Sequence, residues 1–268
     1  MELGQYPPRG GELRPCLSAG RGVVLVDKEK TMIKLGITGS CGKMGRRIFE
    51  LASFDKEFEV TLALEKKGTP LIGRDMGKIK VSSSLDGLFL IDVLVDFTLP
   101  EAADEHLNYA AKYKKALVLG TTGLTDAQVK KVEEVAKVVP VVFTPNMSIG
   151  VNVLFSVLPE IAKRLGPDYS VEIVEAHHKA KKDAPSGTAK KLVELISQAT
   201  GRNIPTHSLR LGDIIGDHTV IFCGNSERIE IKHQAHSRDL FVLGALKAAK
   251  WVAVKPAGLY SMQEVLKQ

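Results

Sequence analysis

The chain has 268 residues, 44% of them hydrophobic and 25% charged, proportions that are ordinary for a soluble globular protein of one or two domains and argue against a collagen-like, coiled-coil or disordered chain. Its formal charge is +6 at pH 7 and its aromatic content 6%, which does not favour a nucleic-acid reader. The three cysteines form no Cys-x-x-Cys pair, and no apolar run reaches the ~18 residues of a membrane span. We therefore expect a reduced cytoplasmic protein that contacts no membrane and holds no metal.

The first 31 residues differ from the rest of the chain. They carry Pro7, Pro8 and Pro15 and show no helical or strand period before residue 23. We predict a flexible N-terminal extension over residues 1–31. A second interpretation is that Met32 is the natural start and that the preceding codons are an artefact.

From residue 33 onward, short apolar strands alternate with helical segments of about a dozen residues. This alternation predicts a doubly wound parallel sheet, a Rossmann-like α/β fold. The expected strands lie at 33–38, 59–65, 91–98, 116–122 and 140–146, and the expected helices at 46–54, 101–113 and 126–137.

The pattern changes after residue 146. Polar and apolar residues alternate with few long helices between them, which predicts a second, smaller α+β domain on a mixed or antiparallel sheet. Helix 240–254 is expected to return to the first domain, so that 32–147 plus 239–268 form one domain and 148–238 the other. The expected strands are 169–178, 207–213, 218–223 and 228–236, and the expected helices are 151–165 and 188–199.

Glycines at 39, 42 and 45 lie between the first strand and the first helix. Glycine in such a turn lets the backbone approach a pyrophosphate, which the free N–H groups at the helix start can bind. Tight strand-to-helix packing is the alternative explanation. Glu65 ends the second strand, where a carboxylate can accept hydrogen bonds from ribose hydroxyls. Lys66 and Lys67 follow it and favour a 2′-phosphate, so the choice between NADH and NADPH stays open.

Two further loops, 120–123 and 144–147, follow predicted strands. Ligands of doubly wound sheets bind at that edge, although ordinary turn chemistry would explain either loop alone.

The stretch EAHHKAKKDAPSGTA, residues 175–189, points to chemistry on an anion. His177 and Lys181 can supply protons, and the backbone N–H groups of Gly187 and Thr188 can cradle a carboxylate. Asp183 and Pro185 suggest the start of a helix. A structural histidine pair is the alternative, whereas a metal site is disfavoured because no ligand spacing typical of zinc is present.

Several segments occur in the order seen in the 4-hydroxy-tetrahydrodipicolinate reductase (dihydrodipicolinate reductase) family, which this chain resembles from Met32 to Val265. They are GSCGKMG, VDFTLPEA, GTTG, NMSIGVN, residues 175–189, RLGDIIGDHTVIF and HQAHSRDLFVLGALKAAKW.

The resemblance implies an oxidoreductase that reduces 4-hydroxy-tetrahydrodipicolinate to tetrahydrodipicolinate with NADH or NADPH, in lysine and diaminopimelate biosynthesis. It implies that His177 is the general acid/base, that Lys181 donates a proton, and that 148–238 binds a small dicarboxylate and joins the subunits of a homotetramer. Substrate binding would fall to His178, Gly187, Thr188 and Arg238. Cofactor contacts would come from Gly39, Ser40, Cys41, Gly42, Lys43, Met44, Glu65, Gly120, Thr121, Thr122, Thr144, Pro145, Asn146 and Met147.

Two rival interpretations remain at this stage. One is another two-domain dehydrogenase, which would not need residues 175–189. The other is a non-catalytic sensor of the NADH/NAD ratio, whose function would survive the loss of the Lys181 amine.

Overall fold

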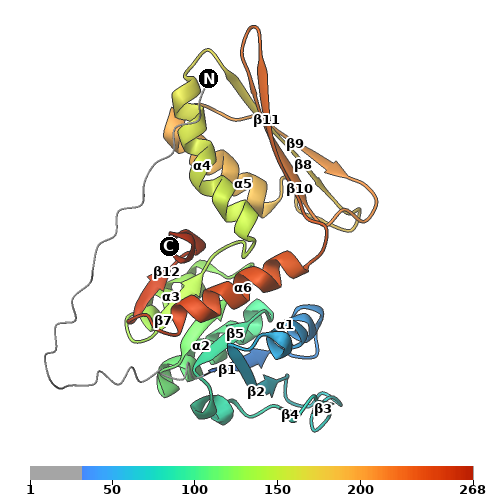
Figure 1. Cartoon of the computed structure of the whole chain (residues 1–268), viewed down its shortest axis with the longest axis vertical. Helices are drawn as coiled ribbons and strands as arrows, with labels where there is room; N and C mark the ends of the chain where they lie inside the picture. Colours follow the sequence, from blue (N-terminus) through green and yellow to red (C-terminus); the bar gives the residue numbers. More distant parts are fainter. Residues whose placement is uncertain (1–31, 268) are drawn as a thin grey trace, which may run out of the picture. The chain divides into compact units, whose positions relative to one another are not determined.

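The structure is a computed structural model that describes residues 32–267, and residues 32–268 form one compact unit (Figure 1). The predicted extension, 1–31, lies outside the described residues. Within residues 32–267, no helix is both long and apolar enough to cross a bilayer.

An eight-stranded sheet, called the first sheet here, forms the larger layer. All its neighbouring strands pair in parallel except β3 and β4, which pair antiparallel, and this confirms the predicted doubly wound α/β fold. In sheet order the strands are β12 (Gly258–Tyr260), β7 (Pro140–Phe143), β6 (Ala116–Leu119), β5 (Val93–Asp96), β1 (Ile33–Thr38), β2 (Phe58–Leu64), β4 (Ile79–Ser82) and β3 (Asp75–Met76).

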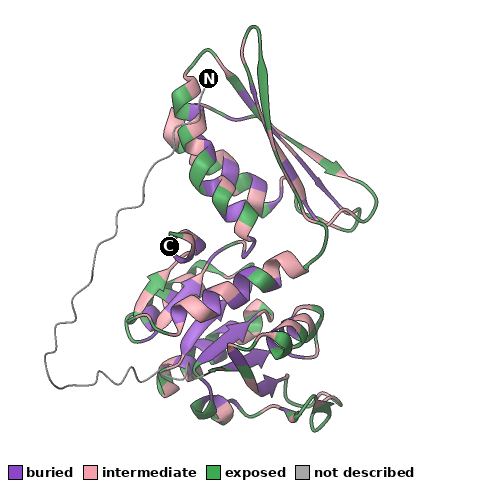
Figure 2. Cartoon of the chain, in the orientation of Figure 1, coloured by how far each residue is buried: buried purple, intermediate pink, exposed green. Residues whose placement is uncertain are grey.

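Helices cover both faces of the first sheet, which is why its central strands are apolar on both sides and buried (Figure 2). One face packs on α1 (Lys43–Phe54), α6 (Asp239–Val252) and α7 (Met262–Leu266) through Ile48, Val242 and Val265. The other packs on α2 (Pro100–Tyr113), α3 (Asp126–Ala136) and the 3₁₀ helix Leu85–Leu90 through Leu107, Val132 and Leu88. The expected return of helix 240–254 to this layer is confirmed by α6.

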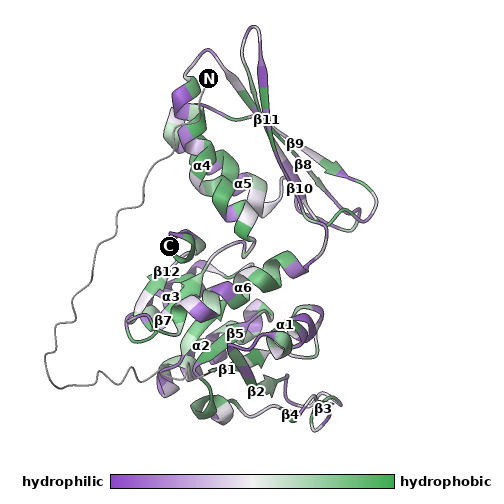
Figure 3. Ribbon diagram, viewed as in Figure 1, coloured by the Kyte–Doolittle hydropathy of each residue, from purple (hydrophilic) through white to green (hydrophobic). Residues whose placement is uncertain are grey.

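A four-stranded sheet, called the second sheet here, is mixed, as predicted. Strand β10 (Asp217–Cys223) pairs antiparallel with β11 (Arg228–Gln234) and β8 (Ser170–His177), and β8 pairs in parallel with β9 (Thr206–Arg210). Helices α4 (Ile149–Leu165) and α5 (Gly187–Thr200) cover one face and present their apolar sides to it (Figure 3). The division of the chain at 147/148 and 238/239 into two domains remains a prediction.

Several element boundaries differ from the predicted ones, chiefly at the C-terminal ends of β5, β6 and β7. Strands expected to run to 98, 122 and 146 end at Asp96, Leu119 and Phe143, so the residues that follow form loops. The predicted helix 188–199 is confirmed by α5, which begins at Gly187 with Ser186 as its N-cap, and Asp183 and Pro185 lie in the loop just before it. The sequence patterns also missed β3, β4, β12 and α7, because these elements are only two to five residues long.

Candidate active site

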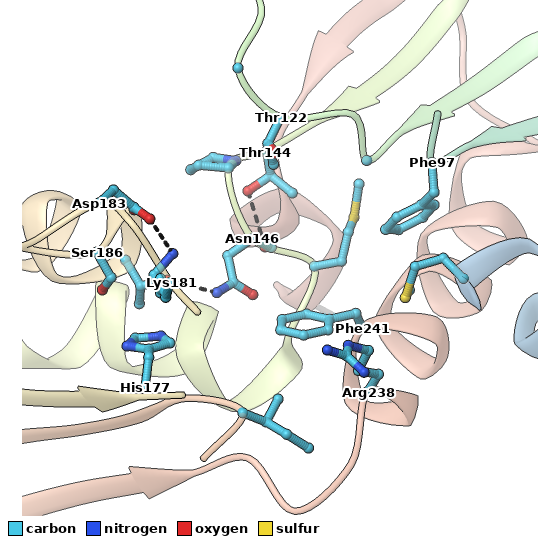
Figure 4. A pocket seen from close by; sticks show the side chains of 18 of the residues that line it. Phe97, Thr122, Thr144, Asn146, His177, Lys181, Asp183, Ser186, Arg238 and Phe241 are labelled. Atoms are coloured by element: carbon cyan, nitrogen blue, oxygen red, sulfur yellow. Dashed lines mark hydrogen bonds and ion pairs between the residues drawn. The ribbon is translucent and has the colours of Figure 1, made fainter. Parts of the chain in front are cut away.

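A cavity of about 810 Å³ opens between the loops that follow β5, β6 and β7 and the loop that follows β8 (Figure 4). The sequence patterns had assigned residues on both walls of this cavity to ligand binding. The structure brings together the candidates His177, His178, Lys181, Gly187, Thr188 and Arg238 with Lys43, Met44, Gly120, Thr122, Thr144, Pro145, Asn146 and Met147. Phe97 and Phe241, which sequence reasoning had not singled out, also line it.

The remaining candidates do not line the cavity; they are Gly39, Ser40, Cys41, Gly42, Glu65 and Thr121. Ser40 and Thr121 are buried, at 0% and 2% exposure, so their side chains support the loops. Gly39 has φ +63°, and Gly45 approaches it so closely that a β-carbon would lie 2.1 Å from the Gly39 carbonyl oxygen. These two glycines therefore allow the turn before α1. Gly42, the N-cap of α1, has no side chain to cap the first N–H groups.

Glu65 and Cys41 meet at the same turn. The backbone N–H of Cys41 donates to Glu65 Oε1 over 2.7 Å, and the N–H of Lys66 donates to Oε2 over 3.3 Å. The carboxylate at the end of β2 thus fixes the glycine turn while each oxygen keeps a lone pair for another donor.

A buried carboxylate that the sequence analysis missed holds two of the cavity loops. Asp96, at the end of β5, accepts hydrogen bonds at Oδ1 from the Thr98 N–H (2.9 Å), the Thr98 hydroxyl (2.6 Å) and the Thr121 hydroxyl (3.2 Å). Its Oδ2 lies 2.7 Å from Nδ1 of His106 on α2. Burial would raise the pKa of Asp96, but His106 and Thr98 outweigh burial and lower it. A charged, fully paired Asp96 therefore fixes the loops after β5 and β6.

On the second sheet, polar side chains form a row next to the apolar core. Strand register aligns Ser208 (β9), Glu175 (β8), His218 (β10) and His233 (β11) across the inner face. The neighbouring register position, with Ile173 and Val220, belongs to the core. The row therefore marks the end of the sheet at which the core stops.

Both covering helices begin on this row. The Ser186 hydroxyl caps α5 by accepting from the Ala189 N–H and lies 3.1 Å from His218 Nε2. The Ser148 hydroxyl caps α4 by accepting from the Val151 N–H and lies 3.4 Å from His233 Nε2. The histidines thereby fix both helix starts. Burial is the main cause that lowers the pKa of His218 to about 4 and also lowers the pKa of His233, so both rings are neutral at pH 7.

His177 is a buried, titratable side chain in the cavity lining. Its Nδ1 lies 2.5 Å from Oε2 of Glu175, which is fully buried. Burial and the cations Lys181 and Arg210 lower the pKa of His177 against the opposing effect of Glu175. The ring is thus neutral with its proton on Nδ1, and Nε2, which hydrogen-bonds to none of the described residues, keeps its lone pair.

Gly216 leaves the space that Nε2 requires. A β-carbon at this position would approach the nitrogen to 3.0 Å.

Lys181 lies in the loop between β8 and α5 and lines the same cavity as His177 (Figure 4). Its ammonium group is 2.8 Å from Oδ1 of Asp183. The hydrogen bond from Lys181 outweighs partial burial and lowers the pKa of Asp183, so the pair is ionic at neutral pH. Asp183 therefore orients the Lys181 side chain from the loop that precedes α5.

The first turn of α5 is suited to anions. Ser186, Gly187 and Thr188 all line the cavity, and the first turn of α5 contains no acidic residue. A β-carbon on Gly187 would meet nothing within 4 Å, which places open space beside that backbone. Among residues 32–267 no group of three or more His, Cys, Asp or Glu side chains is arranged to hold a metal ion.

Comparison with known proteins covers nearly all of the described chain. The family model for the N-terminus of dihydrodipicolinate reductase matches residues 33–147, and the model for its C-terminus matches residues 150–266. The chain belongs to the dihydrodipicolinate reductase family. Among its relatives, the 4-hydroxy-tetrahydrodipicolinate reductase of Geotalea uraniireducens is 44% identical over 264 residues, covering 88% of this chain and 99% of the relative. That of Syntrophus aciditrophicus is 42% identical over 266 residues, covering 88% and 98%.

A solved structure of a dihydrodipicolinate reductase supports the fold. Dipicolinate-bound dihydrodipicolinate reductase from Paenisporosarcina sp. TG-14 has a TM-score of 0.74 and 24% identity, covering 88% of this chain and 100% of its own. This match confirms a Rossmann-like sheet joined to a smaller mixed sheet.

Proposed function

We propose that this chain reduces 4-hydroxy-tetrahydrodipicolinate to tetrahydrodipicolinate with NADH or NADPH, a step of lysine and diaminopimelate biosynthesis. The observation that carries the proposal is the convergence of His177, Lys181 and Thr188 with the loops after β5, β6 and β7 in one cavity. Relatives that bear the name of this reductase match almost their whole length to the chain.

The residues of the first sheet fit a nicotinamide dinucleotide. Gly45 lets the turn pack on Gly39, the uncapped start of α1 offers backbone N–H groups to a pyrophosphate, and Glu65 keeps lone pairs for ribose hydroxyls. When bound, the reduced cofactor supplies the hydride. Lys43, Met44 and loops 120–122 and 144–147 would hold it. Because Glu65 favours a free 2′-hydroxyl and Lys66 and Lys67 favour a 2′-phosphate, we propose that both reduced cofactors are used.

On the second-sheet side, the cavity suits a small dicarboxylate. The N–H groups of Gly187 and Thr188 and the Thr188 hydroxyl would bind one carboxylate, and Arg238, with a planar guanidinium fork, would bind another together with His178. Holding the ring in this position would contribute to the rate by orientation.

Proton delivery falls to His177 and Lys181. The overall step takes up one hydride and one proton, and the 4-hydroxyl group leaves as water. The Lys181 ammonium, held by Asp183, would supply the proton to the reacting centre after reduction. His177, neutral in the free protein, would accept or return a proton at Nε2. The positive charges of Lys181 and Arg238 would stabilise negative charge that develops on the substrate.

We also propose a cytoplasmic homotetramer assembled through the second sheet. Helices α4 and α5 cover the inner face of this sheet, and the outer face carries Val174, Ile221 and Leu209, of which Leu209 is 48% exposed. Light scattering on the purified full chain tests the subunit number, and a monomeric mass would exclude this part of the proposal.

The decisive assay supplies purified protein with enzymatically generated 4-hydroxy-tetrahydrodipicolinate and follows NADH and NADPH oxidation in parallel. Wild type should oxidise both. Lys181→Ala should lower kcat by ~10²-fold or more with little change in cofactor affinity. Lys182→Ala, at an exposed neighbouring position, is the matched control and should behave as wild type. A folded wild type that leaves both cofactors unoxidised would overturn the proposal, and full activity of Lys181→Ala would favour a non-catalytic role for this residue.

A further inference from the structure

Arg210, the last residue of β9, does not line the cavity, but its guanidinium donates four hydrogen bonds, to Glu175 and to the backbone carbonyls of Asp183 and Leu209. Its Nη1 donates to Glu175 Oε2 over 2.8 Å, and its Nη2 donates to Glu175 Oε1 over 2.7 Å. The same Nη2 donates to the backbone carbonyl of Asp183 over 2.6 Å. Strand register places Arg210 beside His177. One guanidinium therefore contacts the carboxylate that holds His177 and the loop that carries Lys181.

We propose that Arg210 is the positioning residue of the acid–base pair: through Glu175 it fixes the tautomer and direction of the His177 ring, and through the Asp183 carbonyl it fixes the loop that presents Lys181. The kinetic part of this proposal rests on the proposed reductase function. The structural part concerns the proton on His177 and can be measured without substrate.

The first of the two contacts of Arg210, with Glu175, acts through charge. Glu175 is fully buried, and burial alone would raise its pKa; Arg210, the Ser208 hydroxyl and His177 outweigh this and lower the pKa to about 2. An ionised carboxylate can accept hydrogen bonds but has no proton to donate. In the neutral His177 ring, the nitrogen that faces Glu175, Nδ1, must therefore carry the proton, and Nε2 keeps its lone pair. The Ser186 N–H also donates to Glu175 Oε1, over 3.1 Å, which ties the start of α5 to the same group.

The second contact of Arg210, with the Asp183 carbonyl, acts by holding the loop in place. Lys181 and Asp183 are held together by their ion pair, and the Lys181 N–H donates to the His178 carbonyl over 3.1 Å. Arg210 anchors the far end of this turn at Asp183. Because one guanidinium makes both contacts, a displacement of Arg210 would move His177 and Lys181 relative to each other, and a shift of about 1 Å in such a pair can cost ~10²-fold in rate.

Lysine cannot replace this arginine. An ammonium group is a point charge that cannot contact both carboxylate oxygens and a carbonyl in one plane. The charges that surround His177 are Glu175 on its own strand, Lys181 on the following loop and Arg210 on β9, with the neutral ring of His218 on β10 centred 5.3 Å away. Removing the Arg210 cation leaves the buried Glu175–His177 pair with a net negative charge, so the pKa of His177 should rise. Removing the charge of Glu175 leaves a net positive group, which should take up a proton less readily.

The test compares Arg210→Met, Arg210→Lys and Glu175→Gln with wild type in the full chain. Histidine ring NMR over pH 5–9, with His177 assigned by its loss in His177→Asn, gives the protonation midpoint of the Glu175–His177 pair. We expect the midpoint to rise in Arg210→Met and to fall in Glu175→Gln. In steady-state assays, kcat should fall ~10-fold or more in Arg210→Lys and ~10²-fold in Arg210→Met, with the KM of NADH within about twofold.

Arg228→Met is the matched control, because Arg228 forms an exposed ion pair with Glu230 at 2.7 Å on β11. It should retain wild-type kcat and the wild-type His177 midpoint. If Arg210→Met does not fold, Arg210→Lys, which keeps a cation beside Glu175, carries the test. Wild-type kcat and an unmoved His177 midpoint in folded Arg210 variants would overturn the proposal. If the wild type is inactive but the His177 midpoint still rises in Arg210→Met and falls in Glu175→Gln, the reductase function is rejected and the positioning role of Arg210 stands.

Discussion

The side-chain amide of Asn146 donates a hydrogen bond to the hydroxyl of Thr188 over 2.9 Å, and this bond joins the loop after β7 to the first turn of α5. Asn146 is itself held by the Ser148 N–H, which donates to its Oδ1 over 2.8 Å. One hydroxyl thus connects a residue proposed to contact the cofactor with a turn proposed to bind the substrate.

Replacing Thr188 by valine should separate these two roles. The substitution preserves the shape of the side chain and removes the hydroxyl, so we expect the KM for the dicarboxylate to rise by about tenfold, the loss of roughly one hydrogen bond to a charged group. The KM for NADH should change less than twofold. The control is Thr200→Val at the other end of α5, where the hydroxyl donates to the Ile196 carbonyl. Equal effects of both variants on the substrate KM would contradict the assignment.

Two glycine substitutions should differ in what they damage. A β-carbon at Gly244 would lie 1.7 Å from the Met147 carbonyl oxygen, whereas one at Gly187 would meet nothing within 4 Å. Gly244→Ala should therefore lower the unfolding free energy by more than about 3 kcal/mol, because backbone on both sides must move. Gly187→Ala should keep the melting temperature and raise the substrate KM. Denaturant titration and steady-state kinetics distinguish them, and a stable Gly244→Ala would show that the helix can shift.

Asp96→Asn tests the buried carboxylate behind the cofactor loops. The amide loses the carboxylate charge and the Oδ2 acceptor that faces His106, and the loss of a buried hydrogen bond to a charged group costs about 1.5–3 kcal/mol. Cofactor affinity should also weaken, since the Thr98 and Thr121 hydroxyls would then share a neutral amide oxygen, a weaker acceptor than the carboxylate. Urea unfolding and NADH titration measure the two effects. Asp75→Asn, which removes an exposed ion pair with Lys80, should change neither.

Stability should fall on mild acidification because of His218. Its pKa is about 4 in the folded protein against 6.5 for an ordinary histidine, so the unfolded chain binds a proton first. The contribution is complete above pH 6.5, declines as pH falls, and is lost by about pH 4. Over this window it amounts to at most about 3 kcal/mol.

His218→Gln should flatten the dependence of unfolding free energy on pH between 6.5 and 4, even if the variant is less stable throughout. His177 and His233, whose pKa values are also lowered, retain part of the slope. Urea titrations at several pH values give the comparison, and parallel curves for variant and wild type would refute the role of His218.

Sequence patterns predicted the layers and most of the cavity, because strands such as 33–38 and the helix that follows have strong local periodicity. They also placed His177 and Lys181 in one short motif. They could not reveal Arg210, which contacts Glu175 across 35 positions of sequence and lies in a short, alternating strand like many others. Asp96 and His218 were missed for the same reason, since only the packed sheets show which polar residues become buried.

Strand β7 of the first sheet ends at Phe143, helix α6 begins at Asp239, and a β-carbon on Gly244 of this helix would lie 1.7 Å from the Met147 carbonyl oxygen, so the helix packs directly on that carbonyl. The two points at which the chain passes between the sheets therefore meet at the Gly244–Met147 contact, called the seam here. An exchange of the strands and helices between these two points for those of a relative would have to rematch this contact together with the Asn146–Thr188 and Asn152–Gln263 hydrogen bonds. Chimeras cut at this seam would keep the core of the first sheet intact while carrying a different binding surface.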